Sequence, residues 1–277
     1  MKNKKFIEIT SVNELNKIGS DNNYPNNGNY KLMNDIDLSD LTIELPLPEF
    51  SGIFDGCNKT IKNISFVDTY NKKFIGLFRS ISKNGKVKNL NIDNFEFIDI
   101  LNPGIITPYN QGLISNCKIT NSKILFEYKQ KSDQYNYFSE YGIISGINLG
   151  KIDKCELEDI EINGISYIGF ICGSNYGIVS NCSINDGSLH GDEYIGGICG
   201  YNYNTIKKCI IKNIELYKCK KYVGGICGYN RKNINDCEFI NISIDGCEKF
   251  YDKICGYNLG SIKHCIYNDD FLERTEY

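Results

Sequence analysis

The residues with the greatest potential for chemistry are the cysteines. The chain of 277 residues holds 13 Cys, together with two His, two Met and no Trp. Thiolates can act as nucleophiles or bind metals, and neighbouring thiols can form disulfides. However, the sequence contains no Cys-x-x-Cys pair and no Cys/His spacing of the usual zinc-binding kind. We therefore expect neither a metal nor a cofactor, and an odd number of cysteines cannot pair completely within one chain.

A cluster of titratable residues is the best candidate for acid/base chemistry. It consists of Asp186, His190, Asp192 and Glu193. Catalysis would require these side chains to converge in a cleft with shifted pKa values. The alternative is a ladder of alternating charge on successive repeats, formed by Glu193, Lys220 and Glu248. We favour the ladder and expect no catalytic residue.

The charge balance and the first residues limit the classes of partner and the compartment. Lys and Arg number 31 and Asp and Glu number 34, a formal net charge of −3, so a nucleic-acid partner is not expected. The segment Met1–Thr10 lacks the apolar run of a signal peptide, and no stretch approaches 18 apolar residues. We expect a cytoplasmic protein without membrane insertion, or an extracellular one if a leader has been removed.

The cysteines lie on an internal repeat. Aligned on the glycine that begins Gly-Gly-Ile-Cys-Gly, successive units begin at Gly76, Gly104, Gly142, Gly169, Gly196, Gly224 and Asp252. The steps are 28, 38, 27, 27, 28 and 28 residues, so the period is 27–28 residues with one insertion of about ten residues. Two columns of Cys recur at fixed offsets, one at Cys172, Cys199, Cys227 and Cys255, the other at Cys117, Cys155, Cys182, Cys209, Cys237 and Cys265. A column of Asn recurs at Asn110, Asn148, Asn175, Asn202, Asn230 and Asn258.

The repeat predicts the fold. Each unit contains short β-branched runs with period-2 alternation, punctuated by Gly, Asn and Asp, and no unit holds an amphipathic helix. We predict an all-β, right-handed parallel β-helix of about eight coils, each with three short strands. Residues 1–50 would form the N-terminal cap and first strands of this single domain, with a short helix over 11–19 that begins in a Ser-x-x-Glu capping box. Residues 51–277 would form the β-helix, with a loop insertion at 126–140 and an end segment at 268–277.

The repeated columns have structural roles in such a stack. Side chains in register on neighbouring coils lie about 4.8 Å apart and parallel, a poor geometry for a disulfide, so we expect the Cys columns to be free thiols. An inward Asn amide can donate to the next coil and accept from the one before, so we expect the Asn column to form a hydrogen-bonded ladder.

The runs Tyr194–Asn202 and Tyr222–Asn230 (YIGGICGYN and YVGGICGYN) resemble GLUG-type repeats. The resemblance covers roughly residues 30–277 and implies a β-solenoid. Such repeats occur in bacterial surface and adhesin-like proteins and in accessory regions of some secreted peptidases. The resemblance is specific for architecture and carries little information about activity.

Tyrosines beside the Asn column form the candidate binding surface. An outward tyrosine next to each inward Asn would give a strip of rings on consecutive coils, and Tyr is favoured at interfaces. Whether the strip binds a partner or only shields the turn stays open, as does the choice between a neutral loop and a binding loop at 126–140. The candidate partner-binding residues are Tyr128, Tyr135, Tyr137, Tyr176, Tyr201, Tyr203, Tyr229 and Tyr257.

We therefore expect a non-enzymatic scaffold that binds a protein, such as an intracellular inhibitor or a phage-type antagonist of a host system. The first alternative is an adhesin-like surface module that binds protein or glycan. The second is a carbohydrate-active β-helix enzyme, which would require clustered carboxylates on one face.

Overall fold

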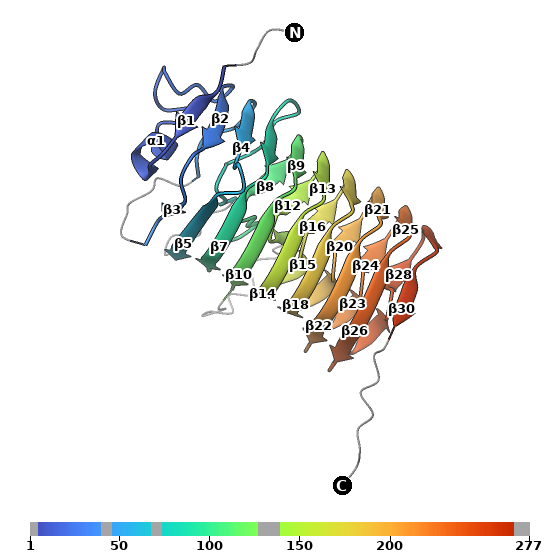
Figure 1. The fold of residues 1–277 in the computed structure, drawn as a ribbon. Helices are drawn as coiled ribbons and strands as arrows, with labels where there is room; N and C mark the ends of the chain where they lie inside the picture. Colours follow the sequence, from blue (N-terminus) through green and yellow to red (C-terminus); the bar gives the residue numbers. More distant parts are fainter. Residues whose placement is uncertain (1–4, 40–45, 68–73, 127–138, 269–277) are drawn as a thin grey trace.

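The chain folds into a stack of coils. The computed structural model describes residues 5–39, 46–67, 74–126 and 139–268. Figure 1 shows a rod of strands lying side by side, with β1 near one end and β30 near the other. All paired strands in this part of the chain are parallel, and they form four sheets of ten, nine, six and five strands. The predicted all-β parallel solenoid of about eight coils is thereby confirmed.

Two sheets run along the whole rod. The ten-stranded sheet contains β1 (Ile7–Ile9), β2 (Asn29–Leu32), β4 (Ile53–Asp55), β6 (Lys86–Lys88), β9 (Leu113–Ser115), β13 (Lys151–Asp153), β17 (Ile178–Ser180), β21 (Thr205–Lys207), β25 (Asn233–Asn235) and β29 (Ser261–Lys263). The nine-stranded sheet contains β3 (Ile36–Asp37), β5 (Thr60–Val67), β7 (Asn91–Ile98), β10 (Lys118–Leu125), β14 (Glu156–Asn163), β18 (Ser183–His190), β22 (Ile210–Tyr217), β26 (Glu238–Asp245) and β30 (Ile266–Asn268).

The remaining two sheets are built from the glycine-rich motif. The six-stranded sheet contains β8 (Thr107–Asn110), β12 (Ser145–Asn148), β16 (Cys172–Asn175), β20 (Cys199–Asn202), β24 (Cys227–Asn230) and β28 (Cys255–Asn258). The five-stranded sheet contains β11 (Tyr141–Gly142), β15 (Ser166–Gly169), β19 (Glu193–Gly196), β23 (Lys221–Gly224) and β27 (Lys249–Asp252).

The prediction of three strands per coil is wrong for the later coils, which have four. The additional corner lies between β15 and β16. The same corner recurs on the following coils, between β19 and β20, β23 and β24, and β27 and β28. Gly169 permits this corner because a Cβ there would lie 2.3 Å from Cys199 Cα on the next coil. The glycine-rich motif therefore forms two short strands in different sheets.

The interior is made of the predicted columns. Ile114, Ile152, Val179, Ile206 and Ile234 come from successive strands of the ten-stranded sheet, and each is fully buried. Identical or similar side chains thus stack from coil to coil, so the same packing is repeated along the rod.

All 13 cysteines are free thiols, as predicted. Cys172, Cys199, Cys227 and Cys255 are in register on consecutive strands, and Cys199 Sγ lies 3.8 Å from Cys227 Sγ. In the other column the thiol donates to the carbonyl two residues earlier, for example Cys182 to Ser180 O at 3.3 Å. The thiols therefore fill an inside corner and find polar partners there.

The asparagine ladder is also confirmed. Asn110 Nδ2 donates to Asn148 Oδ1 at 2.8 Å, and the bond repeats between each successive pair up to Asn230 and Asn258 at 2.7 Å. The first five Asn side chains are fully buried. Because each amide both donates and accepts, the ladder satisfies the buried polar groups of the turn.

The N-terminal helix is shorter than predicted. α1 spans Val12–Asn16, and Ser11 is its N-cap, with Ser11 Oγ accepting from Glu14 N at 3.4 Å. The Glu14 carboxylate accepts from Thr10 N at 2.6 Å, one residue before the position of an ideal capping box. Val12 and Leu15 pack into the core at the end of the rod.

Candidate binding face

Two columns of aromatic rings lie side by side along the five- and six-stranded sheets. The first tyrosine column consists of Tyr167, Tyr194, Tyr222 and Phe250, with ring centroids 4.7, 4.8 and 5.1 Å apart and interplanar angles of 2°, 11° and 9°. The second tyrosine column consists of Tyr201, Tyr229 and Tyr257, with centroids 4.7 and 5.1 Å apart. We refer to both columns, together with Tyr176 and Tyr203, as the aromatic face.

The two columns contact each other at an angle. The rings of Tyr194 and Tyr201 have centroids 5.8 Å apart and planes inclined by 43°, and Tyr222 meets Tyr257 edge-on at 5.9 Å. Stacked pairs within a column and tilted pairs between columns are the two arrangements that the ring quadrupole favours. Each ring is thus held by neighbours on several sides, which makes the aromatic face rigid.

Tyr203 fills a gap in the second column. The register mate of Tyr201 on the preceding coil is Ser174, which has no ring. Tyr203 stacks on Tyr201 at 4.2 Å and on Tyr176 at 4.4 Å, so the run of stacked rings continues past the serine. Arg231 lies over the Tyr203 ring, 5.8 Å from its centroid.

The backbone of the first column is unusual. Tyr167, Tyr194, Tyr222 and Phe250 have φ values of 49°, 59°, 58° and 53°, in the left-handed region that bulky residues rarely occupy. This backbone approaches the next strand so closely that a Cβ at Gly200 would lie 2.2 Å from Tyr194 O. The glycine that follows Cys199, and its equivalents after Cys172, Cys227 and Cys255, are therefore required by the turn that presents the tyrosine.

Burial and neighbouring phenols keep these hydroxyl groups protonated. Burial first, and the adjacent Tyr203 second, raise the pKa of Tyr176 to about 12. The pKa values of Tyr167, Tyr194 and Tyr201 are raised as well, in each case chiefly by burial. The hydroxyl groups are thus available as hydrogen-bond donors at neutral pH.

The structure brings five of the eight predicted binding residues together. Tyr176, Tyr203, Tyr201, Tyr229 and Tyr257 form one run of stacked rings. The expected exposed strip is correct for Tyr176 and Tyr257, which are 43% and 38% exposed, but wrong for Tyr201, which is 9% exposed because other rings cover it. The remaining three, Tyr128, Tyr135 and Tyr137, lie in the 126–140 insertion and outside the described residues.

The sequence prediction missed the first tyrosine column. Its members stand two positions before the residue that begins each unit, and the Tyr-Ile-Gly-Gly and Tyr-Val-Gly-Gly runs contain Tyr194 and Tyr222. That regular offset was a detectable signal. The sequence does not predict the stacking, because these residues fit the alternation of an ordinary strand and their positive φ is seen only in the structure.

The four residues of the candidate acid/base cluster do not converge. Asp192 pairs with Lys220 at 2.8 Å, Glu193 pairs with Lys221 at 3.0 Å, and the His190 ring stacks on Tyr217 with centroids 5.2 Å apart. Asp186 accepts a hydrogen bond from the neighbouring Asn185 side chain.

The predicted ladder of Glu193, Lys220 and Glu248 is also wrong in register. β19 and β23 align Glu193 with Lys221 and then Lys249. The extra residue of this 28-residue unit lies after β22, around Lys218 and Cys219, and therefore moves the partner by one position.

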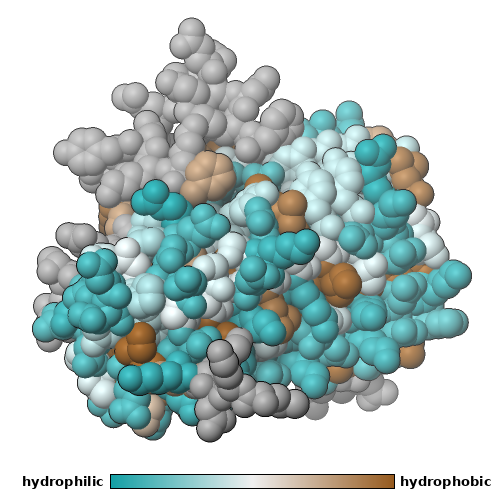
Figure 2. All heavy atoms as spheres, turned by 90° about the horizontal axis from the view of Figure 1, so that it is seen from above, coloured by the Kyte–Doolittle hydropathy of each residue, from teal (hydrophilic) through white to brown (hydrophobic). Residues whose placement is uncertain are grey.

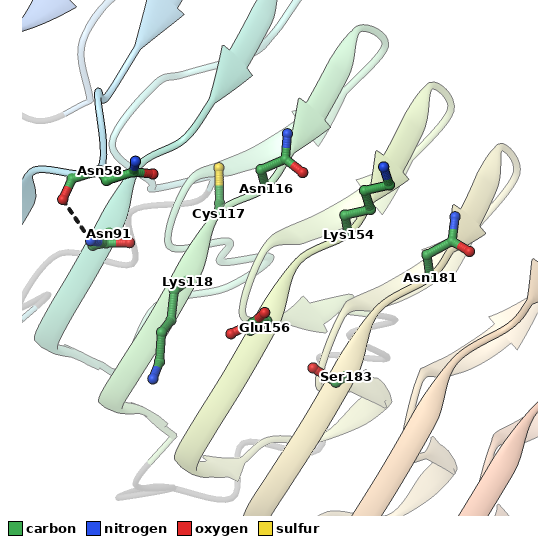
Figure 3. Close-up of a pocket in the computed structure, with 9 residues that line it drawn as sticks. All are labelled: Asn58, Asn91, Asn116, Cys117, Lys118, Lys154, Glu156, Asn181 and Ser183. Carbon is green, nitrogen blue, oxygen red and sulfur yellow. Dashed lines mark hydrogen bonds between the residues drawn. The ribbon is translucent and has the colours of Figure 1, made fainter.

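A separate polar groove lies on the side of the nine-stranded sheet. Its volume is about 490 Å³, and it crosses several coils at the corner before the long strands (Figure 3). The lining residues are Asn58, Asn91, Asn116, Cys117, Lys118, Lys154, Glu156, Asn181 and Ser183. Glu156 is the one carboxylate among these nine residues, whereas glycoside hydrolysis ordinarily uses two.

Neither a metal-ion cluster nor a membrane-spanning helix is present in the described residues. They contain no group of three or more His, Cys, Asp or Glu side chains that could hold a metal ion. In the same part of the chain, no helix has the length and apolar character needed to cross a bilayer. The face seen in Figure 2 is mostly hydrophilic, with apolar residues scattered over it in small groups.

Comparisons with known proteins support the fold. No known family matches the chain, and no curated protein matches it in sequence. A solved structure from Bacteroides ovatus, provisionally named an immunoglobulin A1 protease, superposes with a TM-score of 0.60 at 17% identity, covering 96% of this chain and 85% of that one. At this identity the likeness shows a shared β-helix fold, and the resemblance to GLUG-type repeats rests on the repeat residues alone.

Proposed function

We propose that this protein is a non-enzymatic scaffold that binds a protein partner through the aromatic face. The observation that carries the proposal is the stacking of nine rings from two columns and the turn beside them. Tyrosines contribute large contact areas at a low entropic cost, and rings already fixed by stacking lose little further freedom on binding.

The orientation of the rings favours a protein over a glycan. Sugars bind aromatic side chains by stacking on an open ring face, but inside both columns the ring centroids lie 4.7–5.1 Å apart, so the ring faces cover each other. The groups left for a partner are ring edges and protonated hydroxyls, which suit the carbonyl and carboxylate acceptors of a protein. An adhesin-like module that binds glycan is the alternative, and it would use the outermost rings of the columns.

A rigid rod that occupies a partner's surface suits an inhibitor or antagonist acting inside the cell. Such a protein needs no conformational change to act, and its affinity depends on a preformed binding surface. The 126–140 segment, which is followed by β11 of the five-stranded sheet, would be the second contacting element.

The test is differential capture of partners from the cells that naturally contain the protein. The Tyr194→Asn/Tyr222→Asn double variant removes two central rings and keeps a residue type that tolerates a positive φ. Tyr217→Asn is the matched control, since Tyr217 lies on the nine-stranded sheet and stacks on His190 instead.

We expect a protein that wild type and the control capture in equal amounts and that the double variant does not capture. Equal capture by all three proteins would refute a role for the aromatic face. Binding of oligosaccharides in place of a protein, lost in the double variant, would favour the adhesin alternative.

A further inference from the structure

The first tyrosine column begins with a carboxylate. Tyr141 is the register mate of Ile168, and Gly142 that of Gly169. Glu140 therefore occupies, one coil earlier, the position held by Tyr167, Tyr194, Tyr222 and Phe250 on the coils that follow. The column is thus four aromatic rings with a glutamate at one end.

Glu140 is fixed in place by its backbone and by close packing. Its amide donates to Asn102 Oδ1 at 2.9 Å. A Cβ added to Gly173 would lie 2.6 Å from the Glu140 Cβ and equally close to Tyr167 O, so the glutamate side chain begins directly above a glycine of the six-stranded sheet. This position holds the side chain against the end of the column.

The Glu140 carboxylate is partly buried and has no counter-ion among the described residues. Burial raises the pKa of Glu140. Exposed acidic residues of the rod, such as Asp192 and Glu193, have lysine partners at 2.8 and 3.0 Å. Burial of a charged carboxylate is unfavourable, and a cationic group of a partner placed beside it would offset this cost.

The charge of this carboxylate acts on two tyrosines of the aromatic face. One face of the Tyr167 ring is covered by Tyr194 at 4.7 Å, and Tyr167 is the last ring of the column on the side of Glu140. After burial and the neighbouring phenols, the charge of Glu140 contributes to raising the pKa values of Tyr167 and Tyr176, so both hydroxyl groups lie within its field. Tyr176 remains 43% exposed.

We propose that the end of the aromatic face at Glu140, Tyr167 and Tyr176 binds a cationic side chain, arginine or lysine, of the protein partner. The carboxylate would form the ion pair, and the tyrosine rings would contribute cation–π attraction. The net charge of −3 also favours the approach of a basic segment. This inference rests on the proposed function, because it assigns the chemistry of the partner at one end of the same face.

The test is an NMR titration of the ¹⁵N-labelled protein at low ionic strength. The probes are two blocked hexapeptides of alternating glycine with arginine or glutamine. Glu140→Gln removes the charge and keeps the shape, and Glu161→Gln is the matched control, since Glu161 pairs with Lys123 on the nine-stranded sheet.

We expect the arginine peptide to shift resonances around Tyr167 and Tyr176, and the glutamine peptide to shift them much less. Glu140→Gln should weaken arginine-peptide binding by about tenfold, and Glu161→Gln should change it less than about twofold. Equal binding of both peptides, or unchanged binding by Glu140→Gln, would overturn the assignment.

A second measurement separates this inference from the proposed function. If Glu140→Gln captures the cellular partner like wild type while Tyr194→Asn/Tyr222→Asn loses it, the cation assignment is wrong and the binding face stands. If neither variant changes capture, the aromatic face itself is not the binding surface.

Discussion

The asparagine ladder permits a quantitative prediction at Asn202. Its side chain is fully buried; it accepts from Asn175 Nδ2 at 2.8 Å and donates to Asn230 Oδ1 at 2.8 Å. Asn202→Ala removes one acceptor and one donor in a single step. The two neighbouring amides then lose a partner in a place that water does not readily reach.

The structure also limits the size of the effect. Asn175 Nδ2 keeps a second acceptor, Thr205 O at 3.2 Å, and Asn230 Oδ1 keeps the Lys232 amide at 3.2 Å. An unmade buried hydrogen bond costs about 1–3 kcal/mol. Two such losses, each partly compensated, should lower the free energy of unfolding by about 2–4 kcal/mol.

Urea unfolding monitored by far-UV circular dichroism measures this loss, and Asn258→Ala is the control. Asn258 ends the ladder and is exposed, so water can replace its bonds and the expected loss is below about 1 kcal/mol. Because solenoids can unfold in parts, amide hydrogen exchange in β20 and β24 should report the same difference. Equal stability of Asn202→Ala and wild type, or equal losses in both variants, would refute a stabilising ladder.

Three further predictions concern the thiols and one carboxylate. Maleimide labelling of the denatured, unreduced protein should modify all 13 cysteines, whereas the native rod should expose only the half-buried Cys57, Cys247 and Cys265; fewer reactive thiols after denaturation would indicate disulfides. Cys209→Asp should unfold or aggregate the protein, because an unpaired charge in a dry column costs several kcal/mol, and a soluble variant with wild-type melting would contradict an inward thiol. Burial alone would raise the pKa of Asp153, but hydrogen bonds from Ser180, Asn181 and Lys151 outweigh it and lower the pKa. The stabilisation is therefore present above the unfolded-state pKa of about 3.9 and is lost as the pH falls below it, so thermal melts of Asp153→Asn should depend less on pH in this range than those of wild type.

The fold and its inner columns could be predicted because, in a stack of coils, residues that lie one repeat apart in the sequence contact each other. A residue such as Asn148 meets its equivalents on the coils before and after it, so a regular offset of similar residues reports a ladder directly. The same argument applied to Cys199 and Cys227, whose spacing and parallel direction do not suit a disulfide. No assignment of individual strands was needed for either prediction.

The outer surface was harder to predict because it depends on where each unit changes direction. The extra residue near Cys219 shifted the partner of Glu193 from Lys220 to Lys221, and the unit length alone does not locate it. Tyr201 is buried because the ring of Tyr203 stacks on it, and the offsets of the repeat do not predict this contact. Such details follow from local backbone geometry, which the period of the repeat leaves open.

The positive φ of the first tyrosine column sets a cost in backbone strain against the gain from ring stacking. Other left-handed corners of the described chain carry mostly Asn, Asp or Lys, for example Asn116, Asp159 and Lys208. A left-handed conformation costs an ordinary residue about 1–2 kcal/mol, and a stacked aromatic pair contributes about 0.5–1.5 kcal/mol. Tyr194 contacts the rings of Tyr167, Tyr201, Tyr222 and Tyr229, so the ring contacts together outweigh the strain. Asparagine at Tyr194 and Tyr222 should therefore lower the free energy of unfolding. Under the proposed function, the rings that offset this backbone strain would also form the surface that contacts a partner.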